Sequence, residues 1–563
     1  MKINIKNNSI KTITFFSALI ISLNLYCSNP DWMWANSTGG ADYAQPNCIK
    51  NDKDGNSYLT GYYRASITFD TINFAVSNNL STIFFLAKYS SEGKIIWAKS
   101  AGTNSYQSGN SIAIDNENNI YVTGYFDNYT ITFDDIVLTN TKPGYSNIFL
   151  VKFNSSGKAV WAKNVTGVGN CSGEAVTTDK EGNIYLAGNY DGKNLTIGSV
   201  TLTNTVSNGF NSDIYIAKFN SSGDVLWVKG AGSNSIDEAK KIAIDTNGSI
   251  YLSGVFQGAS LNFNDTTITN NTYGKSEIFL AKYNNNGNII WVKNAIGSKS
   301  EFLNGLYVDP NNNVYIAGDF NSPTLIFDSI SITNTGSYYD LFISKYDTNG
   351  KILWVKRAGR YNDVSASGLQ GDSEGNIYIT GWFSDNSISF GANSLTNDSF
   401  SNDIFVVKFD SAGNDIWVIS PTVSAQVIYT AGISIDSNNS CYITGQFNKS
   451  IVFKNSSVYN NTSLLEIFIA KLGDNSNTKN PTIDSNSLTV YPNPVIDKLH
   501  INLNSNIDKA GKIKLFNIQG QLLIEQPLEK VVSELDFYQF KSGIYILSVE
   551  NNNKQNNFRI IKY

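Results

Sequence analysis

The sequence predicts an all-β protein in which a seven-bladed β-propeller is followed by a small C-terminal β-sandwich. One hairpin pattern recurs seven times at intervals of 63 to 66 residues, which is typical of a repeat fold. No window shows the sustained periodicity of an amphipathic helix. Four antiparallel strands per unit, repeated without helices that could cover a parallel sheet, favour a closed propeller.

The recurring hairpin is clearest at residues 278–291, which read Ile-Phe-Leu-Ala-Lys-Tyr-Asn-Asn-Asn-Gly-Asn-Ile-Ile-Trp. This pattern predicts an apolar strand, a tight turn and a second strand. The lysine alternates with apolar neighbours, so we expect its amine to point outward or to snorkel. It recurs at Lys88, Lys152, Lys218, Lys282, Lys345, Lys408 and Lys471.

Three further landmarks recur in every unit. A Tyr-x-x-Gly stretch has its glycine at Gly61, Gly124, Gly188, Gly254, Gly318, Gly381 and Gly445. The turn before it opens with Asp52, Asp115, Asp179, Asp245, Asp309, Asp372 and Asp436. A tryptophan stands at Trp34, Trp97, Trp161, Trp227, Trp291, Trp354 and Trp417. We interpret the aspartates as caps of backbone amides and the tryptophans as inter-blade core, rather than as a sugar-stacking array.

The second unit shows how the strands are laid out. Its four strands are expected near residues 111–115, 120–126, 148–153 and 159–163. Between the second and third strands, residues 131–139 form a hairpin-like insert with a Phe-Asp turn. Because strand direction alternates, the inserts and the loops between units share one face. This elaborated face is the expected recognition surface.

The two ends of the repeat region indicate how the ring closes. Trp34 precedes the first innermost strand, whereas the last third strand, around residues 467–471, has no fourth strand after it. We therefore expect the N-terminal strand Asp31–Asn36 to complete the last blade, which would leave no edge unpaired between the two ends.

The repeats resemble the SBBP family of bacterial β-propeller repeats. That family has Asp-x-x-Gly-Asn-x-Tyr-x-x-Gly followed by Asp-x-Phe-x-x-Lys-Tyr-Asp-x-x-Gly-x-x-x-Trp. Residues Asp372–Gly381 and Asp403–Trp417 match both stretches, with Phe409 at the tyrosine position. The resemblance covers about residues 31–472. It implies the fold and leaves the activity open, since propellers host both binding and catalysis.

Three other segments flank or follow the repeats. Residues 1–28 read as a signal peptide, with lysines before an apolar run from Ile13 to Leu25 that is too short for a membrane span. We expect no transmembrane span in the mature chain. Residues 473–487 lose all periodicity and are interpreted as a linker. Residues 488–563 show short alternating strands typical of a small β-sandwich.

The last segment resembles the type A C-terminal sorting domain of the type IX secretion system of Bacteroidota. The matching motifs contain Tyr491, Pro492, Asn493, Pro494, Gly520, Gly543, Tyr545 and Lys562. The resemblance implies Sec export to the periplasm and passage across the outer membrane by the type IX machinery. The protein would then be secreted or anchored at the cell surface.

Composition excludes several kinds of chemistry. The net charge of −5, with 16% charged residues, provides no broad basic surface for nucleic acid. The one histidine, His500, lies outside the repeats, so a histidine-centred catalytic site in the propeller is excluded. The turn at Asp52 lacks the glycine position and the final glutamate of a calcium loop. We expect no cofactor, no metal and no nucleic-acid partner.

Two sets of residues are candidates for function. Acids and amides recur in the loops between units, at Asp42, Gln107, Glu174, Asp237, Glu301 and Asp363. They could ring the mouth of the channel, where two carboxyl groups about 5 to 10 Å apart could cleave a glycoside. The residue after the Tyr-x-x-Gly glycine varies, and Trp382 there joins Arg357, Arg360 and Tyr361 as a candidate glycan-binding patch. Ordinary variation of loop residues explains the same pattern.

These observations predict an exported, non-enzymatic propeller that binds a surface glycan or a protein, with no catalytic residues. One alternative is a polysaccharide hydrolase or lyase that acts on the elaborated face. A further alternative is a structural component of the envelope or matrix.

Overall fold

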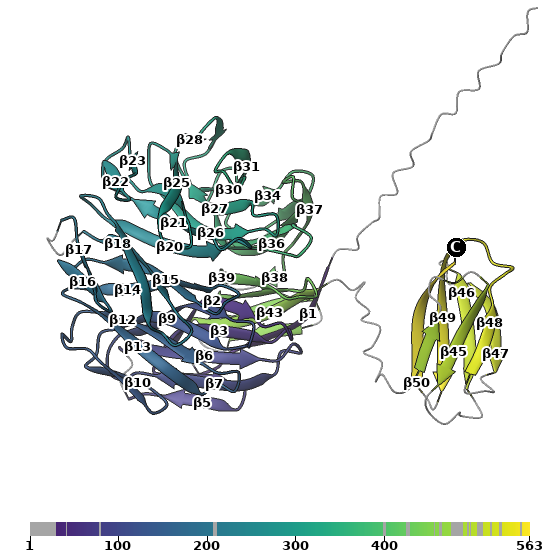
Figure 1. Ribbon diagram of the computed structural model, residues 1–563. Coiled ribbons are helices and arrows are strands. Elements are labelled where there is room, and N and C mark those ends of the chain that lie inside the picture. The colour runs from purple at the N-terminus through teal and green to yellow at the C-terminus, as the bar shows by residue number, and fades with distance from the viewer. Residues whose placement is uncertain are drawn as a thin grey trace, which may run out of the picture. The chain divides into compact units, whose positions relative to one another are not determined.

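Figure 1 shows the computed structural model of the chain. It describes residues 30–40, 42–77, 80–206, 211–397, 401–423, 428–454, 456–460, 464–473, 488–491, 495, 497–503, 511–517, 521–527, 532–551 and 554–562. One compact unit is Pro30–Asp474, and a second unit contains the C-terminal residues from Asn475 onward. Every regular element in the described residues is a strand. The predicted fold class, an all-β propeller with a small second β domain, is confirmed.

The described residues of the first unit form seven antiparallel blades of four strands each. The innermost strands are β2 (Tyr43–Asn51), β8 (Gln107–Ile114), β14 (Cys171–Thr178), β20 (Asp237–Ile244), β26 (Glu301–Val308), β32 (Val364–Gly371) and β39 (Ile428–Ile435). The second strands are β3 (Ser57–Arg64), β9 (Ile120–Phe126), β15 (Ile184–Tyr190), β21 (Ile250–Phe256), β27 (Val314–Phe320), β33 (Ile377–Phe383) and β40 (Cys441–Phe447).

The outer half of each blade repeats the predicted lysine hairpin. The third strands are β6 (Ile83–Tyr89), β12 (Asn147–Phe153), β18 (Asp213–Phe219), β24 (Glu277–Tyr283), β30 (Asp340–Tyr346), β36 (Asp403–Phe409) and β43 (Glu466–Gly473). The fourth strands are β7 (Ile95–Ala101), β13 (Ala159–Gly167), β19 (Val225–Ala231), β25 (Ile289–Ile296), β31 (Ile352–Ala358), β37 (Asp415–Ile419) and β1 (Asp31–Ser37).

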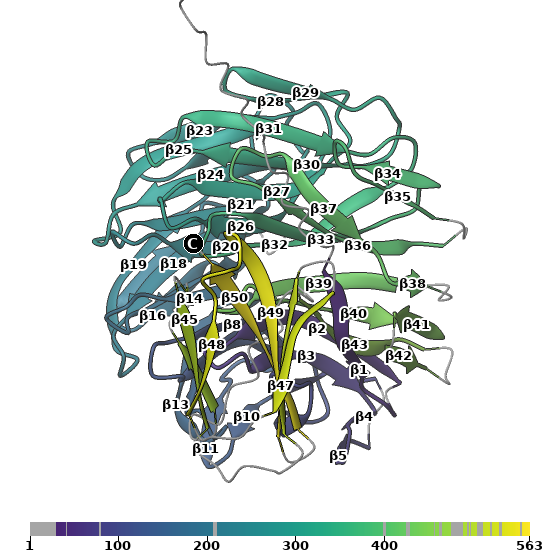
Figure 2. The ribbon, with the colours of Figure 1, turned by 90° about the vertical axis from the view of Figure 1, so that its right-hand side faces the viewer.

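The innermost strands surround a common centre, as Figure 2 shows for β2, β8, β20, β26, β32 and β39. Each of the seven contacts the innermost strand of the next blade, and β39 contacts β2. The N-terminal strand β1 pairs antiparallel with β43, with Trp34 opposite Lys471, so it completes the last blade as predicted. The ring is therefore closed by backbone hydrogen bonds between the two ends of the propeller sequence.

The predicted insert between the second and third strands is a two-stranded hairpin in each blade. The hairpins are β4–β5 (Ser66–Phe69, Ile72–Ala75), β10–β11 (Thr130–Phe133, Ile136–Thr139), β16–β17 (Asn194–Ile197, Val200–Thr203), β22–β23 (Ser260–Asn262, Thr267–Thr269), β28–β29 (Thr324–Phe327, Ile330–Thr333), β34–β35 (Ser387–Ser389, Ser394–Thr396) and β41–β42 (Ser450–Phe453, Ser456–Tyr459). Several of them pair with the preceding blade: β16 with β13, β28 with β25, and β41 with the short strand β38 (Thr422–Val423). The inserts therefore join neighbouring blades.

The core of the propeller lies between adjacent blades. One cluster, for example, combines Tyr185 and Ile216 of the third blade with Leu252, Phe256 and Phe279 of the fourth. A blade is too thin to bury its own apolar faces, so each face is removed from water only by the next blade. The stability of the fold consequently depends on how neighbouring blades meet.

A buried ion pair recurs at this junction, and the hairpin of residues 278–291 shows it. Asp245 accepts hydrogen bonds from the backbone amides of Asn247 and Ser249, at 2.9 and 2.8 Å, and from the Tyr251 hydroxyl at 3.2 Å. The Lys282 amine lies 3.7 Å from this carboxylate and 5.0 Å from the centre of the Tyr251 ring. The aspartate is thus an amide cap, as predicted.

The expectation that these lysines point outward is wrong. Lys282 is only 6% exposed, because the aspartate and tyrosine of its own blade surround its amine. The described residues contain six such lysine–aspartate pairs: Lys88–Asp52, Lys218–Asp179, Lys282–Asp245, Lys345–Asp309, Lys408–Asp372 and Lys471–Asp436. Lys152 has the tyrosine contact, with its amine 5.3 Å from the Tyr121 ring.

At six junctions of the described residues the tryptophan donates to a carbonyl group of the next blade. Lys282 and Trp291 both donate to the Thr348 carbonyl of the following blade, at 3.0 and 3.2 Å. The indole also packs on the same turn at Gly350, where a Cβ would lie 2.9 Å from the ring and φ is +79°. Only glycine satisfies both conditions without strain. Equivalent indole bonds join Trp34 to Ser91, Trp97 to Ser155, Trp161 to Ser221, Trp227 to Asn285 and Trp354 to Ser411.

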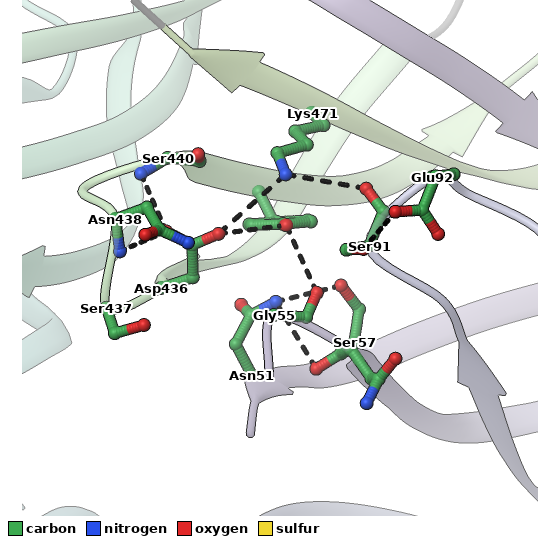
Figure 3. Close-up of polar contacts among 12 residues, drawn as sticks. Asn51, Gly55, Ser57, Ser91, Glu92, Asp436, Ser437, Asn438, Ser440 and Lys471 are labelled. Atoms are coloured by element: carbon green, nitrogen blue, oxygen red, sulfur yellow. Dashed lines mark hydrogen bonds and ion pairs between the residues drawn. The ribbon is translucent and has the colours of Figure 1, made fainter. Parts of the chain in front are cut away.

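Figure 3 shows the junction at which the ring closes. Lys471 lies 3.8 Å from the Asp436 carboxylate and donates to the Ser91 carbonyl of the first blade at 3.4 Å. The Tyr442 hydroxyl lies 3.1 Å from both the Asp436 carboxylate and the Gly55 carbonyl of the first blade, and its one proton can be donated to either. The last and first blades thus meet by the same contacts as blades that are neighbours in sequence.

The C-terminal unit consists of two sheets that share one core. One sheet has the order β44–β45–β48 (Leu488–Tyr491, Lys498–Leu503, Val532–Asp536), and the other has the order β47–β46–β49–β50 (Leu522–Pro527, Lys512–Asn517, Gly543–Asn551, Lys554–Lys562). Leu499, Ile501, Leu515 and Leu547 pack together between them. This arrangement agrees with the predicted small β-sandwich.

Replacing Lys282 with methionine should lower the free energy of unfolding by about 3 kcal/mol, because it leaves the buried Asp245 carboxylate without its cation. Urea denaturation followed by tryptophan fluorescence measures the change. The matched control is Lys293→Met in the same hairpin, because Lys293 pairs with Asp328 at the surface. The control should change stability by less than about 1 kcal/mol. Equal effects of the two substitutions would contradict the role given to the buried pair.

Candidate functional site

The centre of the ring contains a cavity of about 280 Å³, lined by residues of all seven innermost strands. It shares lining residues, among them Asn47, Glu174 and Lys241, with a wider cavity of about 580 Å³. The wider cavity is also lined by Phe302 and Tyr429. We refer to the two cavities as the channel and its mouth. Their sizes are those of a site for a small polar ligand.

A β-bulge occurs at the same place in every innermost strand and supplies the polar lining. Each bulge inserts one residue that has no partner on the second strand, so its side chain is free to point away from the ladder. The seven bulge residues are Asn47, Asn110, Glu174, Lys240, Asn304, Ser367 and Ala431. All of them line the channel or its mouth. One repeated backbone feature therefore presents seven side chains of differing chemistry.

The first two blades each contribute one side-chain amide to the lining of the channel. Asn47 donates to the Ser108 hydroxyl and to the Gly109 carbonyl, both at 2.9 Å. Asn110 donates in the same way to Ser172 at 3.2 Å and to the Gly173 carbonyl at 3.0 Å. These bonds cross from one blade to the next, so they hold both amides in fixed orientations.

The mouth has two exposed aromatic rings. Phe302 is 43% exposed and Tyr429 is 37% exposed, although both line a cavity. Tyr429 is held by an edge-to-face contact with Trp382, with ring centres 5.4 Å apart, and Phe302 packs against Tyr339 at 5.5 Å. Exposed aromatic faces beside amides and charged groups are suited to binding polar ligands that also have apolar faces.

The residue after the Tyr-x-x-Gly glycine lies at the seam between blades. Asn189 accepts the Ala239 amide of the next blade at 2.6 Å, and Asp319 accepts the Ala366 amide at 2.8 Å. Gln446 donates to the Ala44 carbonyl at 2.7 Å, which joins the last blade to the first. Burial raises the pKa of Asp319 to about 7, although its hydrogen bonds lower it. This variable position therefore joins blades beside the channel.

The four residues of the sequence-predicted glycan patch divide into two groups. Arg357 is paired with Asp340 at 2.7 Å, and the Arg360 guanidinium stacks 4.8 Å from the Tyr361 ring. Trp382 makes its aromatic contact with Tyr429 at the mouth. Sequence reasoning therefore found a residue next to the mouth, but missed Phe302, Tyr429 and the bulge residues. A weak signal was available, since the bulge position varies from Asn to Glu, Lys, Ser and Ala.

The predicted acids of the inter-blade loops do not act as one ring. Glu174 lines the channel, whereas Gln107, Asp237 and Glu301 are buried. Asp237 accepts hydrogen bonds from the amide and hydroxyl of Ser233, and Glu301 accepts one from the Ser322 hydroxyl. Burial raises the pKa of Asp237 to about 8 and that of Glu301 to about 8. These two side chains hold their own loops.

Part of the predicted sorting motif can be located. Gly543 begins β49 and pairs with Lys562 of β50, which is buried. The Tyr545 hydroxyl donates to the Lys541 carbonyl at 2.7 Å. Tyr491 ends β44. The remaining motif residues, Pro492, Asn493, Pro494 and Gly520, lie outside the described residues.

The described part of the chain offers neither a metal-binding cluster nor a long apolar helix. No group of three or more His, Cys, Asp or Glu side chains there is arranged to hold a metal ion. No helix there has the length and apolar character that crossing a membrane requires.

Glu301→Gln should make stability less sensitive to pH. Because the pKa of Glu301 is raised in the folded state, its protonated form stabilises the fold, and this contribution is lost as pH rises from about 4.5 to about 8. The free energy of unfolding of the variant should therefore equal that of the parent near pH 4.5. At pH 8 it should be at least about 1 kcal/mol higher than that of the parent. Urea denaturation at both pH values tests this, with the exposed Glu181→Gln as control. A variant less stable at pH 8 would refute it.

Two family models match the chain. Residues 489–563 match the secretion system C-terminal sorting domain, and residues 96–125 match the β-propeller repeat of the SBBP family. The second match spans part of the first and second blades. Both matches agree with the resemblances seen in the motifs.

Individual relatives are distant. An uncharacterized WD repeat-containing protein of Acanthamoeba polyphaga mimivirus is 27% identical over an alignment of 536 residues, which takes in 78% of this chain and 38% of the viral protein. The regulatory protein FlaEY of Caulobacter vibrioides is 25% identical over 111 residues, or 20% of this chain and 12% of that protein. The chain thus spans well under half the length of the curated relatives that it matches.

Among solved structures, the Pan2 WD40 domain of Neurospora crassa is similar with 9% identity and a TM-score of 0.41, over 80% of this chain and 96% of that one. PorZ, a surface component of the type IX secretion system of Porphyromonas gingivalis, is similar with 12% identity and a TM-score of 0.28, over 92% of this chain and 74% of that one.

The family matches are more specific than these structural similarities. The C-terminal segment of this chain is a type IX secretion sorting domain, its repeats are β-propeller repeats, and the protein is exported to the cell surface or the medium.

Proposed function

We propose that this protein is an exported, non-enzymatic module that binds a glycan at the mouth of its central channel. The observation that carries the proposal is the mouth itself, where the exposed rings of Phe302 and Tyr429 stand beside the polar bulge residues. Sugar rings have apolar faces that stack on aromatic side chains and hydroxyl groups that hydrogen bond to amides. The site offers both kinds of group on a rigid scaffold.

The alternative of a hydrolase or lyase has less support. Such chemistry needs an acid and a base that reach one substrate atom. Among the described bulge residues, Glu174 is the one carboxylate. The nearby Asp319 is engaged by Asn304, Ser365 and Ala366 at 2.7 to 2.9 Å. A structural role in the envelope would give no reason for either ring to be exposed.

Phe302→Ala and Tyr429→Ala should each weaken glycan binding about tenfold, because each removes a stacking surface. A glycan array followed by titration calorimetry on the purified protein measures the loss, with release of reducing sugar assayed in parallel. The control variant is Tyr361→Ala, which changes the patch predicted from sequence. Loss of binding in Tyr361→Ala alone would show that the glycan binds at the patch predicted from sequence and not at the mouth. Release of sugar would favour the enzyme, and the absence of any ligand would favour the structural role.

Deleting residues 488–563 should leave the propeller in the periplasm, because the deletion removes the segment that matches the sorting domain. Cell fractionation and protease accessibility of whole cells distinguish periplasmic from surface-exposed protein. The propeller should remain folded, since it forms its own compact unit. Undiminished surface display of the truncated protein would show that this domain is not what directs export.

A further inference from the structure

We propose that the glycan bound by this protein is acidic, and that its anionic group enters the channel to meet the amine of Lys241. The proposal rests on the proposed function, because it specifies the ligand class of the same site. It is carried by the position of Lys241, by its lack of a protein partner and by the balance of charge around it.

Lys241 follows the bulge residue Lys240 on β20 and lines both the channel and its mouth. It is half-buried and forms no hydrogen bond or ion pair with any described residue. The buried lysines of the blade junctions contrast with it, because six of them pair with an aspartate. An ammonium group partly removed from bulk water is stabilised by an anion, and no carboxylate of the described residues lies within ion-pair distance of this one, although Glu174 acts on it from farther away.

The charges that line the narrow channel sum to a positive value. They are Lys50, Glu174 and Lys241, so two cations and one carboxylate leave a net charge of +1. Lys240 does not alter this balance, because it pairs with Glu238 at 2.9 Å. The whole chain has the opposite sign, with a net charge of −5. The channel is therefore locally positive although the protein is negatively charged, and this favours the entry of anions.

The amides of the channel are weaker donors to an anion than Lys241, because they are uncharged. The side-chain nitrogens of Asn47 and Asn110 are bonded to the next blade, and that of Asn304 donates to Asp319 at 2.9 Å. Sugar hydroxyl groups can still bond to the second N–H of Asn304 and to the amide oxygens. The ammonium groups of Lys241 and Lys50 are the charged donors of the channel, and a charge-assisted bond to a carboxylate or sulfate is stronger than a neutral one.

The titration of Lys241 provides a second readout. Burial lowers its pKa, Lys50 and Lys240 lower it further, and Cys48 and Glu174 act in the opposite direction. A bound anion would favour the charged amine and raise this pKa again. Binding of an acidic ligand should therefore take up protons, and affinity should fall as pH rises through the pKa of the free protein.

The test compares acidic glycans with uncharged forms of the same glycans. The purified protein is applied to an array of uronate-containing and sulfated oligosaccharides, each beside its methyl-esterified or desulfated counterpart. We expect at least one acidic probe to bind about tenfold more tightly than its counterpart, a difference of about 1.4 kcal/mol. The uronate and sulfate arms identify which anionic group the channel accepts.

The variants are Lys241→Met and, as a control with the same change of charge, Lys53→Met at an exposed turn position. Lys241→Met should abolish the preference for the acidic probe and should not lower the melting temperature, because Lys241 has no ion-pair partner among the described residues. Lys53→Met should retain the preference. Calorimetry in buffers of different ionisation enthalpy should show proton uptake by the parent and none by Lys241→Met.

Three outcomes would overturn the proposal, and they differ from failure of the proposed function. Equal affinity for acidic and uncharged probes would refute the acidic ligand but leave glycan binding intact. A preference that survives in Lys241→Met would refute the role of this residue. Absence of binding to every probe, acidic or neutral, would contradict both the inference and the proposed function.

Discussion

The structure depends on the contact between a buried lysine, the tryptophan of its hairpin and one carbonyl group of the following blade. In the hairpin of residues 278–291, Lys282 and Trp291 share the Thr348 carbonyl. The lysine is also held by Asp245 and Tyr251 of its own blade. This contact links the polar interior of one blade to the turn of the next, so it sets the distance between them wherever it recurs.

Closure of the ring imposes a strict condition on this contact. The last junction must be made with the first blade, and Lys471 reaches the Ser91 carbonyl with the same geometry. Strand β1 pairs with β43 of the last blade, which adds backbone hydrogen bonds at that point. Because every face of a blade is buried only by its neighbour, a change in one junction would be transmitted around the ring. This explains why the four landmarks of the repeat hardly vary.

Variation is greatest at positions beside the channel, outside the four landmarks of the repeat. The bulge residues lie beside the channel and are released from the strand ladder, so their side chains can differ without changing the fold. Lys241, Phe302 and Tyr429 lie close to these bulges in the sequence. The landmark residues of the fold and the residues of the candidate site thus occupy different positions of the same repeat. The landmark residues can stay the same in every blade while the site residues differ.

The sequence by itself determined the all-β fold, the repeat, the strand that closes the ring and the sorting domain, because each depends on spacing or on local motifs. Only the tertiary structure decided the surroundings of individual side chains. Five of the lysines predicted to point outward or to snorkel are buried beside aspartates, since the partner comes from another strand. Asp237 and Glu301 turn into their loops, and the bulges are defined by register between strands. Such features depend on what lies across a junction, which a linear pattern does not contain.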